Sequence, residues 1–130
     1  MIGIDANVLI RFLTQDDPVH SPIATRLFHR FTETEPGYIS LIALAEAVWV
    51  MKRTLRVPTE EIADAIEMLL RTKSVLVQSS NQVYYAMVSM REGTGSFADA
   101  LIAELGEWAG CEFTYTFDVK ASRLQAFRQL

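Results

Sequence analysis

Several features are scarce in this chain of 130 residues, and each scarcity excludes a class of protein. A single cysteine, Cys111, rules out an internal disulfide and fits a reducing compartment. No apolar stretch approaches the roughly 18 residues of a membrane span. The first residues contain no basic region, and Asp5 falls where the apolar part of a signal peptide would lie. We therefore expect a cytoplasmic protein.

Positive charge is also in short supply. The chain has 12 Lys and Arg against 16 Asp and Glu, which gives a formal net charge of −4. This balance argues against a surface that coats nucleic acid, because such surfaces are basic. It does not exclude a nuclease, because bound metal ions invert the local sign of the charge at a site. The length and the hydrophobic content predict one domain, residues 1–130, with a core of its own.

The sequence does contain short apolar segments that alternate with stretches of helical pattern. The apolar segments predict strands at 2–5, 38–39, 75–77 and 112–117, and helices are expected between them. Ser40 and Ser96 are the expected N-caps of two of these helices. The helix after Ser40 is apolar almost all round, so it should be buried on most sides. Strands separated by helices predict an α/β fold with a mainly parallel sheet covered by helices.

Four acids interrupt apolar segments, where carboxylates are unusual: Asp5, Glu46, Asp99 and Asp118. An unpaired charge is costly to bury, so four such acids suggest one shared partner, most simply one or two divalent cations. Asp5 and Asp118 end predicted strands, and ligands bind at that edge of an open parallel sheet. A carboxylate cluster without His or Cys is an oxygen-only site, which suits Mg²⁺ or Mn²⁺ better than zinc.

Each acid also has a structural explanation of its own. Asp5 and Asp118 could each cap a helix that follows, and Asp99 could be the acid of a capping box. Glu46 could pair with Arg53, seven residues further along and roughly on the same helix face. Only the coincidence of four acids in similar settings favours a common site over these separate explanations.

The order and spacing of the acids resemble those of PIN domains, and of the VapC-type toxin ribonucleases in particular. Asp5 and Asn7 form a D-x-N motif after the first strand, and Glu46 stands where those proteins have a helix glutamate. Asp99 resembles their third acidic position. Asp118 closes a T-x-D motif at the end of a strand. The resemblance covers the whole chain.

This resemblance implies a three-layer PIN-like fold, in which helices flank a mainly parallel sheet of four or five strands, usually in the order 3-2-1-4-5. It also implies a Mg²⁺- or Mn²⁺-dependent endoribonuclease in which the four acids are catalytic and metal-site residues. Asn7 and Thr116 would hold the carboxylates by hydrogen bonds. Proteins of this kind are usually homodimers, and a small VapB-type antitoxin encoded beside them inhibits them. Whether a fifth strand forms near Phe127 stays open.

Five basic residues are candidates to touch RNA phosphates, although such residues are more often plain solvated charges: Arg11, Lys52, Arg53, Arg56 and Lys120. One rival interpretation is a non-catalytic PIN-like module that acts only through a partner protein. A second rival is a metal-dependent phosphatase or phospho-acceptor domain. Such domains usually place another acid near the first one, and here Asn7 occupies the position two residues after Asp5.

Overall fold

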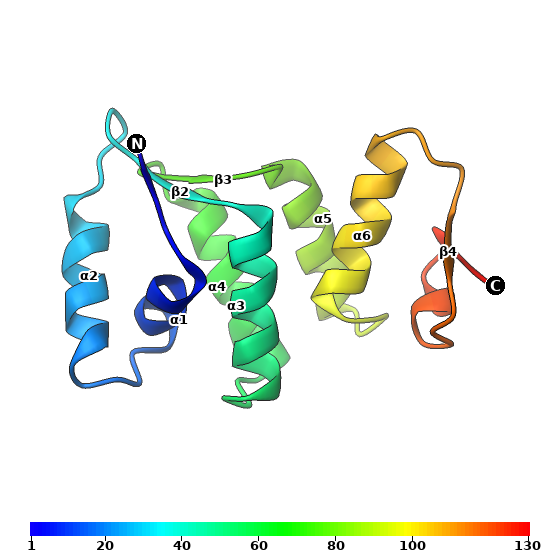
Figure 1. The fold of residues 1–130 in the computed structure, drawn as a ribbon, viewed down its shortest axis with the longest axis horizontal. Helices are drawn as coiled ribbons and strands as arrows, with labels where there is room; N and C mark the ends of the chain where they lie inside the picture. Colours follow the sequence, from blue (N-terminus) through cyan, green and yellow to red (C-terminus); the bar gives the residue numbers. More distant parts are fainter. The chain divides into compact units, whose positions relative to one another are not determined.

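The computed structural model describes residues 1–130, which form two compact units, unit 1 (residues 1–80) and unit 2 (residues 81–130). Unit 1 contains β1 (Ile2–Gly3), α1 (Ala6–Thr14), α2 (His20–Arg30), β2 (Gly37–Ile39), α3 (Leu41–Arg53), α4 (Thr59–Arg71) and β3 (Val75–Val77) (Figure 1). From the unit boundary onward follow α5 (Ser80–Arg91), α6 (Phe97–Trp108), β4 (Thr114–Thr116), the 3₁₀ helix η1 (Ala121–Arg123) and β5 (Phe127–Gln129). The predicted α/β class is confirmed. None of the helices combines the length and apolarity needed to cross a membrane.

All strand pairs are parallel. In unit 1 the strand order is β1-β2-β3, and in unit 2 β4 pairs with β5. The strand order 3-2-1-4-5 expected for the fold contains these same neighbouring pairs, β1–β2 and β2–β3 in unit 1 and β4–β5 in unit 2. The open question of a strand near Phe127 is thereby answered by β5. The strands expected at 2–5 and 112–117 are shorter than predicted, because the regular pairing covers only Ile2–Gly3 and Thr114–Thr116.

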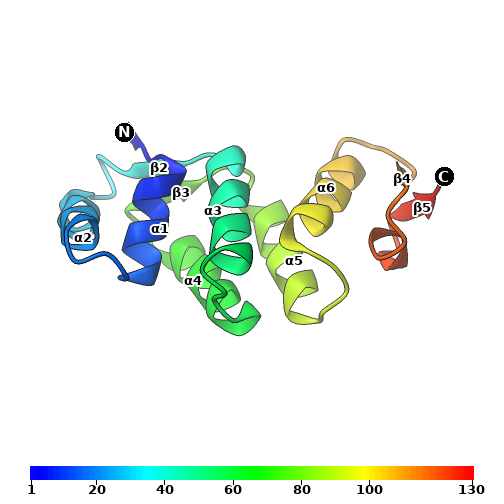
Figure 2. The ribbon, with the colours of Figure 1, turned by 60° about the horizontal axis from the view of Figure 1, so that its bottom comes forward.

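The core of unit 1 forms where amphipathic helices meet the sheet. α1 packs against α2 and α3, as Figure 2 shows, and α3 packs against α4. On α4 the largest fully buried side chains are Ile62, Ile66 and Leu69, whose spacing is that of one helical face. Each such side chain contributes about 1.5–3 kcal/mol when it leaves water. Ile39 of β2 is fully buried as well.

Both predicted serine caps are present. The Oγ of Ser40 accepts a hydrogen bond from the backbone N–H of Ala43 (3.1 Å), and the Oγ of Ser96 accepts one from Asp99 (3.1 Å). Each bond satisfies one of the backbone donors that the first turn of a helix leaves without an intrahelical partner. The starts of α3 and α6, and hence the positions of Glu46 and Asp99 on them, are therefore set locally.

Gly37 allows the closest approach in unit 1. A Cβ added there would lie 2.6 Å from Cε2 of Phe31 and 2.8 Å from Cδ1 of Ile4, whereas a Cβ at Gly3 would meet nothing within 4 Å. We expect Gly37→Ala to lower the free energy of unfolding by about 1–3 kcal/mol, because the core must shift to admit the methyl group. Urea unfolding followed by circular dichroism measures the change. Gly3→Ala is the matched control on the neighbouring strand, and equal effects of the two variants would contradict this packing.

Asp17 caps the start of α2. Its Oδ1 accepts hydrogen bonds from the backbone N–H groups of His20 (2.7 Å) and Val19 (2.9 Å). These backbone bonds, first that of His20 and then that of Val19, together with the His20 imidazole, hold the pKa of the Asp17 carboxyl at about 2, below its usual 3.8. The ionised carboxylate therefore stabilises the fold above pH 3.8, and that contribution is lost as the pH falls through about 2.

Asp17→Asn tests this cap, because the amide resembles the protonated carboxyl. We expect the wild type to be more stable than Asp17→Asn at neutral pH, and the difference to shrink as the pH is lowered from 3.8 towards 2. Urea midpoints measured across this window give the difference. Glu33→Gln, in an exposed loop, is the control for the loss of one acid. A difference between wild type and Asp17→Asn that does not depend on pH would contradict the low pKa.

Candidate metal centre

Asp5 lies at the carboxyl end of β1 and at the N-cap position of α1. The Ile4 N–H donates to the carbonyl of Tyr38 (2.9 Å), which extends the β1–β2 register and places Asp5 level with Ser40. The carboxylate is exposed and makes no capping hydrogen bond; only the Asp5 carbonyl joins the helix, by accepting from Leu9 (3.1 Å). The capping explanation therefore leaves the Asp5 side chain unused and both of its oxygens open to a ligand.

Glu46 lies on α3, six residues after Ser40. A rise of about 1.5 Å per residue places it about 9 Å along the helix from that strand end. Its side chain is exposed and makes no ion pair with Arg53. The Arg53 guanidinium instead lies 5.9 Å from the centroid of the Trp49 ring, within the range of a cation–π interaction. The alternative that Glu46 pairs with Arg53 is therefore wrong.

Gln78 fixes the position of α3 in a way that the sequence did not reveal. Its side-chain oxygen accepts a hydrogen bond from the backbone N–H of Leu41 (2.9 Å) and thus ties the first turn of α3 to the chain just after β3. The two residues are 37 positions apart, and nothing local in the sequence marks them as partners. The ends of all three strands of unit 1, at Asp5, Ser40 and Gln78, are thus held at one edge of the sheet.

Asp99 lies in the first turn of α6, where it is half-buried. Its backbone N–H bonds to the Ser96 hydroxyl, but its carboxylate makes no hydrogen bond or ion pair, so only the serine half of the capping box forms. Further along α6, a Cβ added to Gly106 would lie 3.0 Å from the Thr114 Oγ1, which shows that β4 comes close to this helix. α6 and β4 run in opposite directions (Figure 1), so the start of α6 and the end of β4 lie towards the same end of unit 2.

Asp118 follows β4 and is held by two neighbours. Its Oδ1 accepts hydrogen bonds from the backbone N–H groups of Lys120 (2.8 Å) and Ala121 (3.4 Å), so it does cap η1. The Thr116 Oγ1 accepts a hydrogen bond from the Asp118 N–H (3.0 Å). The threonine therefore contacts the backbone of the acid, and the Asp118 Oδ2 stays open. Asn7, the other residue expected to hold carboxylates, lies exposed in the first turn of α1, and its side chain makes no hydrogen bond.

The apolar neighbours of the four acids in the sequence suggested that these acids are buried, and this expectation is wrong. Asp5, Glu46 and Asp118 are exposed, and Asp99 is half-buried. Two of them sit where the chain leaves a strand, and Glu46 shares a face of α3 with residues that are themselves exposed. In neither unit do three or more His, Cys, Asp or Glu side chains gather in a geometry that would hold a metal ion. The cost of burying charge therefore gives no support to a shared cation, and the case for one rests on the open carboxylate oxygens.

The structure reduces the number of basic residues that are candidates to touch RNA phosphates. Arg11 donates to the Asp16 carboxylate (3.0 Å), Lys52 donates to the Thr59 hydroxyl, and Arg53 lies over Trp49. These three cations are engaged within their own unit. The side chains of Arg56 and Lys120 have no such partner, and they are the candidates that stay open to a phosphate.

One acid with a shifted pKa, Glu104, is not among the four predicted site residues. Burial, and then the negative charge of Glu107, raise the pKa of Glu104 on α6 above its usual value. The sequence contains a signal for this raised pKa, because Glu104 and Glu107 are three residues apart on a helix and so occupy neighbouring positions on one face. Perturbed acids are commoner at functional sites than elsewhere, and they also arise from plain like-charge pairs such as this one.

Comparison with known proteins places these residues in a family. The model of the PIN domain family matches residues 2–126, a range that spans both units and includes all four acids. No match was found among curated proteins. PIN domains are generally nucleases, and they typically use divalent metals. Because the family model matches nearly the whole chain, the protein belongs to the PIN domain family.

Proposed function

We propose that this PIN domain is a Mg²⁺- or Mn²⁺-dependent endoribonuclease, and the toxin of a VapBC-type toxin–antitoxin module. Asp5, Glu46, Asp99 and Asp118 would together hold the metal. The observation that carries the proposal is that all four acids lie within the family match and that each keeps at least one carboxylate oxygen without a hydrogen bond or ion pair.

The donors suit a hard divalent cation. Carboxylate oxygens are the ligands preferred by Mg²⁺ and Mn²⁺, and neither His nor Cys stands beside any of the four acids in the sequence. Asp118 is already oriented, because two backbone N–H groups hold its Oδ1 and leave its Oδ2 for a metal. Asp5 offers an unpaired side chain at the strand-end edge of unit 1, and Glu46 offers one on α3, about 9 Å along the helix from that edge. The residues present therefore fit the cofactor of the family.

The site residues would have different roles in cleavage. When bound, the cation lowers the pKa of a water molecule and offsets the negative charge of the phosphodiester. Asp5, Asp99 and Asp118 would hold the cation, and Glu46 would complete the set or orient the attacking water. Thr116 fixes the backbone of Asp118 through its hydroxyl, and Asn7 would hold the neighbouring carboxylate once the cation has ordered it. An acidic chain could bind RNA in this way, because the cations replace a basic surface.

The same acids would also give the site its regulation. A cluster of open carboxylates attracts an Arg or Lys side chain, which can occupy the position of the cation. A VapB-type antitoxin that supplies such a side chain would block the site. The chain would act in the cytoplasm, and as a homodimer, which is what the VapC-type resemblance implies.

The first prediction concerns cleavage. We expect the protein to cleave tRNA or rRNA with Mn²⁺ or Mg²⁺ and not with EDTA. Asp5→Asn and Asp99→Asn should each lower the rate at least about 100-fold, because the electrostatic contribution of a bound metal is several kcal/mol. Gel analysis of purified RNA measures the rates. Asp16→Asn is the matched control, because its exposed pair with Arg11 contributes little. Cleavage at the wild-type rate by both site variants would rule out this mechanism.

The second prediction concerns metal affinity and does not require the RNA target. Thr116→Val should weaken Mn²⁺ binding about 10–100-fold, because the Asp118 N–H loses its acceptor and the backbone that carries the carboxylate is held less firmly. Thr116→Ser keeps the hydroxyl and should bind nearly as the wild type does. Titration calorimetry gives both affinities. If the wild type bound no Mn²⁺ at all, the chain would be better described as a non-catalytic module that acts through a partner.

A further inference from the structure

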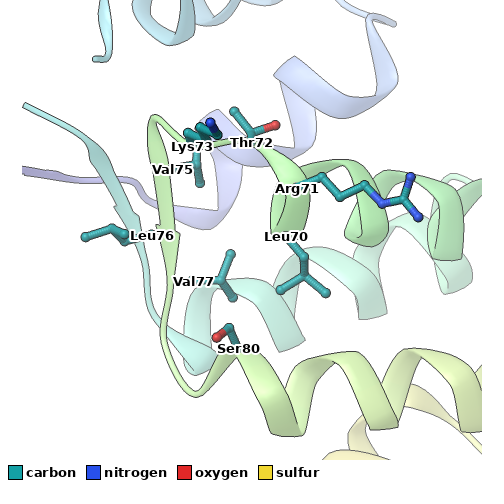
Figure 3. Close-up of a pocket in the computed structure, with 8 residues that line it drawn as sticks. All are labelled: Leu70, Arg71, Thr72, Lys73, Val75, Leu76, Val77 and Ser80. Atoms are coloured by element: carbon teal, nitrogen blue, oxygen red, sulfur yellow. The ribbon is translucent and has the colours of Figure 1, made fainter. Parts of the chain in front are cut away.

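A pocket of about 260 Å³ opens in unit 1 between the end of α4 and β3, the edge strand of the sheet. Figure 3 shows Thr72 and Lys73 at one end of the pocket and Ser80 at the other, with Leu70 and Val77 facing each other between them. No acidic side chain lines it. The pocket therefore has two polar ends and an apolar middle, and neither the metal centre nor any predicted site uses it.

The positive charge of the pocket comes from Lys73. Its ammonium group is exposed and makes no hydrogen bond or ion pair. Arg71 also lines the pocket, but one of its terminal nitrogens bonds to Glu67 (2.8 Å), and its side chain points away from Leu70 and Val77 in Figure 3. An unpaired ammonium beside a pocket without acids gives a local anion-binding position on a chain whose net charge is −4.

The rest of the lining selects for a flat, partly apolar ligand. Leu70 and Val77 are half-buried, so a ring placed between them would cover the remaining exposed part of each. The Thr72 hydroxyl donates to the carbonyl of Met68 (2.7 Å) and can only accept from a ligand, whereas the Ser80 hydroxyl is free to donate. A ligand with apolar faces, polar edges and one anionic group matches this arrangement. A pocket smaller than the about 300–1,000 Å³ of typical ligand sites holds one such unit and not a longer segment.

The pocket runs along β3 from Lys73, which precedes the strand, to Ser80, which follows it, so only its Ser80 end lies at the sheet edge that carries Asp5. β3 is two strands away from β1, which corresponds to about 10 Å at a strand spacing of 4.7–4.9 Å. Ser80 follows the carboxyl end of β3, and Asp5 follows the carboxyl end of β1. A ligand phosphate at Lys73 would therefore lie at the sheet edge opposite Asp5, so a nucleotide bound there would flank the cleaved bond at a distance along the RNA.

We propose that this pocket binds one nucleotide of the RNA substrate, with its phosphate at Lys73 and its base between Leu70 and Val77. The identity of the ligand rests on the ribonuclease function proposed above. Such a subsite would select single-stranded or looped RNA, because a base paired in a helix cannot enter a pocket.

Titration of the full-length Asp5→Asn protein with adenosine and uridine monophosphate in EDTA tests the proposal without cleavage or metal. We expect the backbone amide signals of Thr72, Lys73 and Val77 to shift in NMR spectra. Lys73→Ala should weaken the binding about tenfold, because a charge-assisted hydrogen bond to the phosphate is lost. Arg30→Ala, which removes one positive charge from the exposed surface of α2, should change the affinity less than about twofold.

Leu70→Trp should abolish the shifts by filling the pocket, and Lys73→Ala remains informative if that variant does not fold. Inorganic phosphate or a glutamate-rich peptide that bound as tightly as the mononucleotides would overturn the proposal, as would an unchanged affinity in Lys73→Ala. RNA cleavage by the wild type without any mononucleotide binding would refute the proposed nucleotide subsite and leave the ribonuclease function standing. Mononucleotide binding in a protein that cleaves no RNA would instead refute the ribonuclease function.

Discussion

The parallel register of β1 and β2 is the constraint on which the candidate site depends. The hydrogen bond from the Ile4 N–H to the Tyr38 carbonyl sets the two chains level, so the residues that leave both strands emerge at one edge. From that edge Asp5 starts α1, and Ser40 starts α3 by accepting the hydrogen bond from Ala43. Gln78 joins the third strand to the same edge through Leu41. One register and two side-chain bonds therefore position Asp5 and Glu46.

Unit 2 positions its two acids by equally local means. Ser96 sets the first turn of α6 and with it Asp99, and Thr116 and the N–H groups after β4 hold Asp118. Gly106 lets Thr114 approach α6, which brings the strand against the helix. Hydrogen bonds between residues that are close in the sequence therefore position the two acids of unit 2, although β4 and β5 are only three residues long.

What could be predicted from the sequence follows the range of the interaction concerned. The Ser40 and Ser96 caps, the alternation of strands and helices and the cap at Asp118 all depend on residues within a few positions of one another, and the structure confirms them. The exposure of the acids was not predicted, because apolar neighbours in a sequence do not show which face of an element is covered.

The helix α3 is the clearest case of this limit. It is apolar almost all round, yet Ile42 is 81% exposed and Trp49 is 57% exposed, on the same side as Glu46. Helical periodicity assigns these residues to one face, but only the packing of distant segments decides whether that face is covered. The bond between Gln78 and Leu41 escaped prediction for the same reason, since 37 residues separate its partners.

The central proposal is that the four acids share one metal site, which holds one or two cations. Mn²⁺ is paramagnetic and broadens the NMR signals of nearby nuclei, so a titration with less than one equivalent of Mn²⁺ tests the claim most directly. We predict that the amide signals of Asp5, Glu46, Asp99 and Asp118 broaden together and at the same added Mn²⁺. Broadening confined to the two acids of one unit, with the other two unaffected, would contradict a shared metal centre.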